Sequence, residues 1–324
     1  MLLHTNVIND PINLRMPGIL WLNARSMADN FSRQTAQQRI YQKFADLVGE
    51  NKKTIDLAQA ALLIASVAYP DLDPVPPFTQ LDALAQRVRL LVERSRSALA
   101  ETSPSEQDNP LLLIEALNQV LIEEEHFHGN EHDYYNPDNS FLNKVLEERT
   151  GLPITLSLVY IEVGKRAGIE LEGIGFPYHF MVRYRWSGGS IYIDPFANGL
   201  LLNEEECLKR IQQITHHHNA INPRWLEALP PQKILIRILN NLKSIYIRKD
   251  DFEHALAISD LLLLLLPEAG VEQRDRGFLH LELKHYGRAM HDLSDYLVTH
   301  PQARDRYEIR NHIKQIRQVI AQLN

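Results

Sequence analysis

The sequence predicts an α+β protein that is mostly helical and contains one small antiparallel sheet. Three observations support this fold class. Apolar residues recur at helical spacing through residues 35–125. Three short segments between residues 171 and 194 are rich in β-branched and aromatic residues and are separated by turn signals, which is typical of antiparallel strands. From residue 233 onward the chain is helical again and repeats with a period of 34 residues.

The composition is that of an ordinary globular protein, with 324 residues, 44% hydrophobic residues and a formal net charge of −7. The acidic balance argues against a nucleic-acid-binding surface. The longest apolar run, Leu261–Leu266, is far too short to span a membrane, and the first residues lack the pattern of a signal peptide. The single cysteine, Cys207, excludes an intrachain disulfide. We therefore expect a cytoplasmic protein with no nucleic acid or membrane partner.

The N-terminal part divides into two regions. Residues 1–34 are polar and lack periodicity, so we expect a poorly ordered extension there. Residues 35–125 are expected to form a helical module, in which Thr54 is the N-cap of the second helix. The expected helices cover residues 35–49, 54–69, 79–99 and 111–125.

Residues 126–215 are expected to form the core domain. A polar loop leads into a helix with Ser140 as its N-cap. Pro153 opens the next helix, and Gly168 terminates it. The expected strands cover residues 171–176, 178–185 and 190–194, and a further helix covers residues 203–214.

Two groups of histidines raise the question of a metal site. The loop residues His126, His128 and His132, with Asp133 beside them, match no metal-binding spacing, and capping of backbone groups explains such a loop equally well. The run His216–His218 follows a helix, where protonatable residues are favoured by the helix dipole. We expect no metal and no other cofactor, and we keep a metal-dependent hydrolase as the third hypothesis for function.

The C-terminal region, residues 233–324, has the tetratricopeptide pattern. An aromatic residue is followed by a small residue three positions on and by a proline twelve positions further. The pairs that are 34 residues apart are Phe252 and Tyr286, Ala255 and Ala289, and Pro267 and Pro301. Gly277 occupies another small-residue position, whereas the first copy has Lys243 there, and residues 304–323 are expected to form a capping helix. Because helical repeats present extended binding surfaces, we expect a protein partner to bind through residues 233–304.

The core contains a helix start, then His179 on a strand, then Asp194 on the next strand, which is the order of a papain-like or transglutaminase-like triad. If residues 186–189 form a four-residue loop, His179 lies opposite Phe196 and Asp194 lies two residues away on the same face. The hairpin therefore permits a contact between the histidine and the aspartate. The cysteine that such a site requires at the helix start is missing.

Residues 129–199 resemble a known family. The stretches GNEHDYYNPDNSFLNKVLEERTGLPITLSLVYIEVGKRAG, GFPYHFMVRY and IYIDPFANG are similar to the SirB-type, transglutaminase-like proteins of bacteria, which include the YchA proteins. The resemblance covers about residues 50–304. It implies a helical N-terminal part, a transglutaminase-like α+β core and a helical repeat tail.

The resemblance also implies roles for individual residues. In active members of the wider superfamily a cysteine attacks an amide, a histidine acts as base and acid, and an aspartate orients the histidine. His179 and Asp194 match the last two roles. The cysteine position falls at about residues 153–155, where no cysteine is found.

Other side chains could replace the missing nucleophile or line a pocket. Thr155 and Ser157 lie on the right helix, although a hydroxyl needs a well-placed base and an oxyanion hole. Cys207 comes after Asp194, in the wrong order, and follows three glutamates that raise a thiol pKa. We expect the residues lining the pocket rim to be Tyr135, Asn136, Asn139 and Tyr178.

These residues suggest two hypotheses for function that come before the metal-dependent hydrolase. The first is a non-catalytic protein that acts as an interaction or regulatory factor through its core pocket and its repeats. The alternative is a hydrolase or acyltransferase on amide or ester bonds that uses Thr155 or Ser157 with His179 and Asp194.

Overall fold

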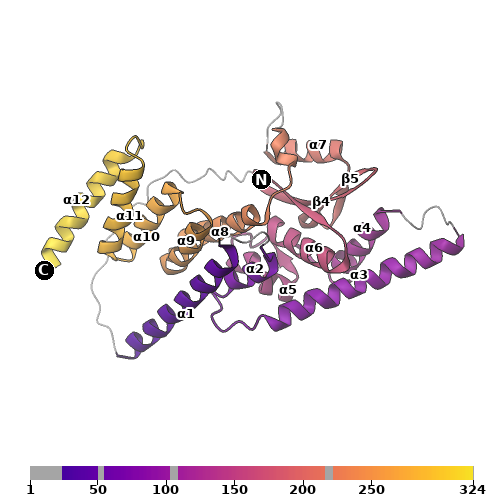
Figure 1. Ribbon diagram of the computed structural model, residues 1–324, viewed down its shortest axis with the longest axis horizontal. Coiled ribbons are helices and arrows are strands. Elements are labelled where there is room, and N and C mark those ends of the chain that lie inside the picture. Colours follow the sequence, from indigo (N-terminus) through magenta and orange to yellow (C-terminus); the bar gives the residue numbers. More distant parts are fainter. Residues whose placement is uncertain (1–23, 50–54, 103–108, 216–221, 324) are drawn as a thin grey trace. The chain divides into compact units, whose positions relative to one another are not determined.

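The computed structural model describes residues 24–49, 55–102, 109–215 and 222–323 (Figure 1). The chain is mostly helical with small sheets, which confirms the expected fold class. It divides into two compact units. One unit includes α1, the second half of α8 and α9–α12, and the other includes α2–α7, the strands and the first half of α8. Among the described residues, no helix is long and apolar enough to cross a membrane.

The N-terminal helices are close to those expected, with differences at their ends. The structure has α1 at Ala24–Val48, α2 at Leu57–Ala65, α3 at Val75–Thr102 and α4 at Leu111–Asn118, which continues into the π-helical turn η1 at Gln119–Glu124. Of the expected extension over residues 1–34, residues 1–23 lie outside the described residues. The expected N-cap Thr54 also lies outside them. At the start of α2, the carboxylate of Asp56 accepts a hydrogen bond from the backbone N–H of Gln59.

The core domain is built around a four-stranded antiparallel sheet. Its strands are β3 at Leu171–Phe176, β4 at His179–Trp186, β5 at Gly189–Asp194 and β6 at Leu200–Leu202, in that order across the sheet. Its helices are η2 at Pro137–Ser140, α5 at Leu142–Glu148, α6 at Pro153–Ala167, η3 at Pro195–Ala197, α7 at Glu204–Thr215 and η4 at Pro223–Leu226.

A second, parallel pair of strands in the core was not expected from the sequence. Strand β1 at His128–Gly129 pairs with β2 at Thr150–Gly151, and each strand has only two residues. The backbone N–H of Asn130 extends this pairing to the carbonyl of Gly151 at 3.1 Å. The loop before α5 is thereby fixed to the chain just before α6.

The residues expected at the ends of α5 and α6 can be compared with the caps in the structure. Ser140 is not the N-cap of α5, because Phe141 occupies that position. The Ser140 hydroxyl is buried and has no hydrogen-bond partner among the described residues. In α6 the expectations hold, since Pro153 is in the first turn and Gly168 ends the helix with φ of 83°. A left-handed φ of this kind favours glycine over other residues.

The repeat region contains two helix pairs and a capping helix. Its helices are α8 at Pro231–Arg248, α9 at Phe252–Leu265, α10 at Gly270–Glu282, α11 at Tyr286–Thr299 and α12 at Arg306–Leu323. Phe252 and Tyr286 begin α9 and α11, and Pro267 and Pro301 follow the same two helices. The expected 34-residue repeat is confirmed.

The unequal residues of the two repeats have a packing explanation. A Cβ on Gly277 would lie 2.9 Å from Leu293, so α10 and α11 require a glycine to approach this closely. The equivalent Lys243 is buried and reaches Glu272 with its ammonium group at 2.5 Å. Glu272 also accepts a hydrogen bond from Ser259 at 2.6 Å. At this position the first repeat therefore has a buried ion pair, whereas the second repeat has two closely packed helices.

Candidate functional site

His179 and Asp194 form a buried hydrogen-bonded pair. The Nε2 atom of His179 lies 2.9 Å from Oδ2 of Asp194, and the two residues are 6% and 0% exposed. The register of the β4–β5 hairpin is the expected one, since Arg185 pairs with Ser190. The turn is tighter than expected, because Trp186 and Gly189 also pair.

Asp194 reaches the histidine because β5 ends at this residue. Its Oδ1 atom accepts a hydrogen bond from the backbone N–H of Ala197 at 3.2 Å and so caps η3. This cap leaves Oδ2 to accept from His179. One carboxylate therefore ends the strand, caps the following turn and orients the imidazole.

The charges around Asp194 keep its carboxylate ionised. Burial alone raises the pKa of this group, but the hydrogen bond and charge of His179, the charge of Arg210 and the Ala197 N–H together bring the pKa below its usual value. The guanidinium of Arg210 lies 3.3 Å from Oδ2. An ionised carboxylate can only accept hydrogen bonds, so the proton is on Nε2 of His179. In the neutral imidazole, Nδ1 is then the basic atom, and it has no hydrogen-bond partner among the described residues.

Two aromatic rings flank the imidazole, and a cation contacts the backbone beside it. The ring centroids of Phe176 and Phe196 lie 5.6 and 6.1 Å from that of His179. Phe196 rests on strand β1, since a Cβ on Gly129 would lie 2.5 Å from its ring. Arg237 donates hydrogen bonds to the backbone carbonyls of Phe176 and His179 at 2.5 and 2.7 Å, and burial lowers the pKa of Arg237 to about 10. The backbone and the ring of His179 are therefore both held in place.

Cys207 lies in the core cluster on the same face of the sheet as the pair. Met181 and Tyr192 share this face with His179 and Asp194 because side chains alternate along a strand. Both pack in one cluster with Cys207 of α7. Burial, with a smaller contribution from the Asp194 charge, raises the pKa of the Cys207 thiol to about 12. A buried thiol that stays protonated is a poor nucleophile.

The start of α6, where the resemblance implies a cysteine position, is closed by backbone capping. The hydroxyl of Thr155 donates to the carbonyl of Asn139 at 2.6 Å and accepts from the backbone N–H of Leu152 at 3.0 Å. A Cβ on Gly151 would lie 2.9 Å from this hydroxyl, so only glycine fits there. The Ser157 hydroxyl is buried and has no hydrogen-bond partner in the described ranges. Within the described part of the chain, neither hydroxyl is hydrogen-bonded to His179.

Two of the expected rim residues have structural contacts. Asn139 is buried, and its side-chain amide donates to the carbonyl of Asp133 at 2.7 Å and accepts from Asn130 at 3.0 Å. The side chain of Asn136 accepts from the backbone N–H of Asp138 at 3.1 Å and caps η2. These side chains shape the loop that leads to the helix start.

The two tyrosines proposed for the rim differ in exposure. Tyr135 is half-buried and packs edge-on against Tyr134 at 5.5 Å. Tyr178 is 56% exposed and directly precedes His179 in the turn between β3 and β4. Its φ of 68° is unusual for a bulky residue and marks local strain. Tyr178 is therefore the accessible side chain nearest in sequence to the buried pair.

No group of three or more His, Cys, Asp or Glu residues in the described ranges is arranged to hold a metal ion. In the loop, Nδ1 of His128 lies 2.8 Å from the carbonyl of His126. The run His216–His218 lies outside the described residues.

Sequence reasoning missed Arg210 and Arg237, which contact Asp194 and the backbone of His179. Both residues are on helices that follow the core strands, α7 and α8. Their sequence context carries no motif that points to the pair. Only the packing of these helices beside the sheet brings the two guanidinium groups to the site.

Two family models match the chain. The model described as "Transglutaminase-like superfamily" matches residues 78–240, and the one described as "Tetratricopeptide repeat" matches residues 242–314. The first match includes His179, Asp194 and the start of α6, and the second covers most of the repeat region.

Similar proteins are found in bacteria and in animals. A protein of Xylella fastidiosa strain Temecula1 with the name "UPF0162 protein" is 36% identical over 283 residues, which cover 86% of this chain and 95% of that protein. A protein of Vibrio cholerae with the same name is 28% identical over 257 residues, covering 79% and 90%. The "F-box only protein 21" of Mus musculus is 34% identical over 169 residues, which cover 48% of this chain and 26% of that protein. No solved structure shows significant similarity to the chain.

Proposed function

The chain belongs to the transglutaminase-like superfamily, among the YchA-like UPF0162 proteins, and on this basis we propose that it is a non-catalytic interaction or regulatory factor. Its core would retain the scaffold and the His179–Asp194 pair of the superfamily without the cysteine chemistry. Its tetratricopeptide-like repeats would bind a protein partner.

The observation that carries this proposal is the hydrogen bonding of Thr155. Its single hydroxyl proton is directed at the carbonyl of Asn139, and its oxygen accepts from Leu152. A nucleophile must instead be placed within reach of its base. The position of the missing cysteine thus serves to cap a helix. Ser157 and Cys207 are buried and offer no replacement.

Exposed apolar side chains on the repeats support the binding role. Val271 of α10 is 53% exposed, and Val298 of α11 is 78% exposed. Single exposed apolar residues are common on protein surfaces, but these two lie in the region that matches the tetratricopeptide model, and helical repeats bind partners through extended surfaces. We propose that the partner binds to residues 233–304.

The ionised Asp194 and the free Nδ1 of His179 favour a second candidate, a hydrolase or acyltransferase. In that reaction the oxygen of Thr155 or Ser157 would attack the carbonyl carbon of an amide or ester. The hydroxyl proton would pass to Nδ1 and then to the leaving amine or alcohol. Thr155 would first have to release its hydrogen bond to Asn139.

We further propose four regions, namely an extension at 1–34, a helical module at 35–125, the core at 126–215 and the repeats at 233–324. Helix α1 begins within the first of these regions, at Ala24. The lone, buried Cys207 supports a cytoplasmic location.

Capture of the partner tests both candidates. Full-length protein is cross-linked in an extract of its source organism, and the retained partner is identified. We expect Val271→Asp with Val298→Asp to abolish retention, because charges replace exposed apolar contacts, while Gln302→Asp on the same unit does not. Unchanged retention by the double variant would remove the repeats from the proposal.

The mass of the retained partner then separates binding from catalysis. Incubation with the wild-type protein should leave the intact mass of the partner unchanged. A cleavage or acyl transfer that occurs with the wild type and disappears with His179→Ala would establish the enzyme instead.

A further inference from the structure

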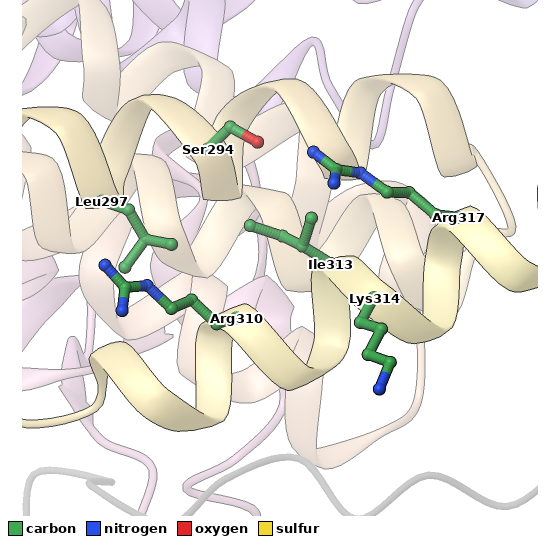
Figure 2. A pocket seen from close by; sticks show the side chains of 6 residues that line it. All are labelled: Ser294, Leu297, Arg310, Ile313, Lys314 and Arg317. Atoms are coloured by element: carbon green, nitrogen blue, oxygen red, sulfur yellow. The ribbon is translucent and has the colours of Figure 1, made fainter.

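A groove lies between the last two helices, α11 and α12, with a volume of about 420 Å³. Its lining residues are Ser294, Leu297, Arg310, Ile313, Lys314 and Arg317. Figure 2 shows Leu297 and Ile313 facing the space between the helices, with the guanidinium groups of Arg310 and Arg317 on either side of Ile313. The groove therefore has an apolar floor and a cationic rim.

The three cations of the rim have no anionic partner. Arg310, Lys314 and Arg317 form no ion pair within the described residues. Their spacing of four and three residues places them on one face of α12, where like charges repel one another. On α12 the positions three and four residues away from these cations contain no acidic residue, and Glu308 lies two residues before Arg310.

Two arginines of α10 in the same unit are paired with carboxylates. Arg274 contacts Asp305 at 2.7 Å, and Arg276 contacts Asp292 at 2.8 Å. Carboxylates are thus available in this unit, but none is placed at the groove. The groove on α12 therefore gathers three cations without a carboxylate, in a chain with a net charge of −7.

We propose that this groove binds an acidic peptide segment of a protein partner, with an apolar side chain on Leu297 and Ile313 and carboxylates on Arg310, Lys314 and Arg317. Charge complementarity selects the acidic residues, and the apolar floor favours a peptide over a nucleic acid. Tyr307, exposed at the start of α12, lies one turn before Arg310 and extends the same face. The inference rests on the proposed role of the repeats in protein binding, and it extends the binding surface from residues 233–304 onto α12.

Fluorescence anisotropy of the full-length protein tests the groove directly. The probe is a fluorescein-labelled peptide of glutamates interrupted by leucines. The comparison probes are the same peptide with lysine in place of glutamate and a single-stranded DNA oligonucleotide. We expect saturable binding of the acidic peptide, which weakens as salt is raised, and no binding of the lysine peptide.

Charge reversal locates the binding site. Arg310→Glu with Arg317→Glu should weaken peptide binding by about tenfold or more. The matched control, Lys284→Glu with Arg288→Glu, makes the same change in net charge at exposed positions of the same unit and should leave binding unchanged. Equal unfolding midpoints would show that both variants are folded.

Three results would overturn the inference: no saturable binding of the acidic peptide, equal weakening in the control variant, or tighter binding of the oligonucleotide through the same arginines. The captured partner separates this inference from the proposed function. If the groove variant retains the partner and the Val271 and Val298 variant loses it, only the groove is wrong. If both variants retain it, the proposed function of the repeats is wrong as well.

Discussion

The β4–β5 hairpin and the start of α6 carry the residues that the resemblance matches to the two sides of a transglutaminase-like site, but their side chains are used differently. The hairpin holds a buried pair, His179 and Asp194, and one imidazole nitrogen has no hydrogen-bond partner in the part of the chain that the structure describes. At the start of α6, the hydroxyl of Thr155 is fully used by backbone groups. The hairpin side of the site thus keeps a group that can accept a proton, whereas the hydroxyl at the start of α6 only stabilises the local structure.

This difference shows that the pair contributes to the fold independently of any nucleophile. Asp194 caps η3 through Ala197 and contacts both His179 and Arg210. Such a residue stabilises the fold whether or not catalysis occurs. Thr155 likewise joins the loop at Asn139 to the first turn of α6. The side chains on both sides of the site thus stabilise the fold. They differ only in whether a group is left for chemistry.

The largest effect is expected from Asp194→Ala. Removal of the buried carboxylate leaves Arg210, His179 and the Ala197 N–H without their acceptor, which should lower the free energy of unfolding by about 3–5 kcal/mol. Urea denaturation of the core measures this loss. If the free energy of unfolding falls no more than for an ordinary surface substitution, the carboxylate does not stabilise the hairpin as proposed.

The same carboxylate predicts how stability depends on pH. Because the folded pKa of Asp194 is lowered, its contribution is present above the unfolded value of about 3.9 and is lost as the pH falls through the folded pKa. Asp194→Asn should therefore show a shallower fall in stability at acid pH than the wild type. An unchanged acid limb would contradict the lowered pKa.

A smaller effect is expected on the other side of the site. Thr155→Val keeps the shape of the side chain but leaves the Asn139 carbonyl and the Leu152 N–H unpaired, at a cost of about 1–3 kcal/mol. Thr155→Ser keeps the hydroxyl and loses one methyl group, so it should cost only about 1 kcal/mol. Equal losses in the two variants, measured by chemical denaturation, would show that the hydroxyl does not act as a cap.

The smallest effect concerns the turn that leads into His179. Tyr178 has a φ of 68°, which is more favourable for glycine, so Tyr178→Gly should stabilise the fold by about 0.5–1 kcal/mol. Tyr178→Ala removes the same side chain without this relief and is the matched control. If the two variants have the same melting temperature, the turn is not strained.

Local sequence signals predicted much of the fold. Pro153 and Gly168 correctly marked the ends of α6, and the turn residues between β4 and β5 gave the correct register. The 34-residue spacing from Phe252 to Tyr286 identified the repeats. These features depend on short-range geometry, which the sequence records directly.

The features that the sequence did not predict depend on long-range packing. Strands β1 and β2 have two residues each, too few for a periodic pattern, and they form only because their loops meet. Ser140 has the composition of an N-cap, but Phe141 takes that position and leaves the serine hydroxyl buried. Arg210 reaches Asp194 only through the packing of α7 beside the sheet. For the site, the sequence supplied the pair but not the hydrogen bonds of Thr155.

Covalent labelling tests most directly whether His179 activates either hydroxyl at the start of α6. The protein is exposed to a fluorophosphonate and to a β-lactone, which acylate or phosphonylate activated hydroxyls, and the intact mass and the modified peptides are measured. We predict no adduct on Thr155 or Ser157, since the first is held by Asn139 and the second is buried. One adduct per chain at either residue, lost in His179→Ala, would contradict the account and identify the protein as an enzyme.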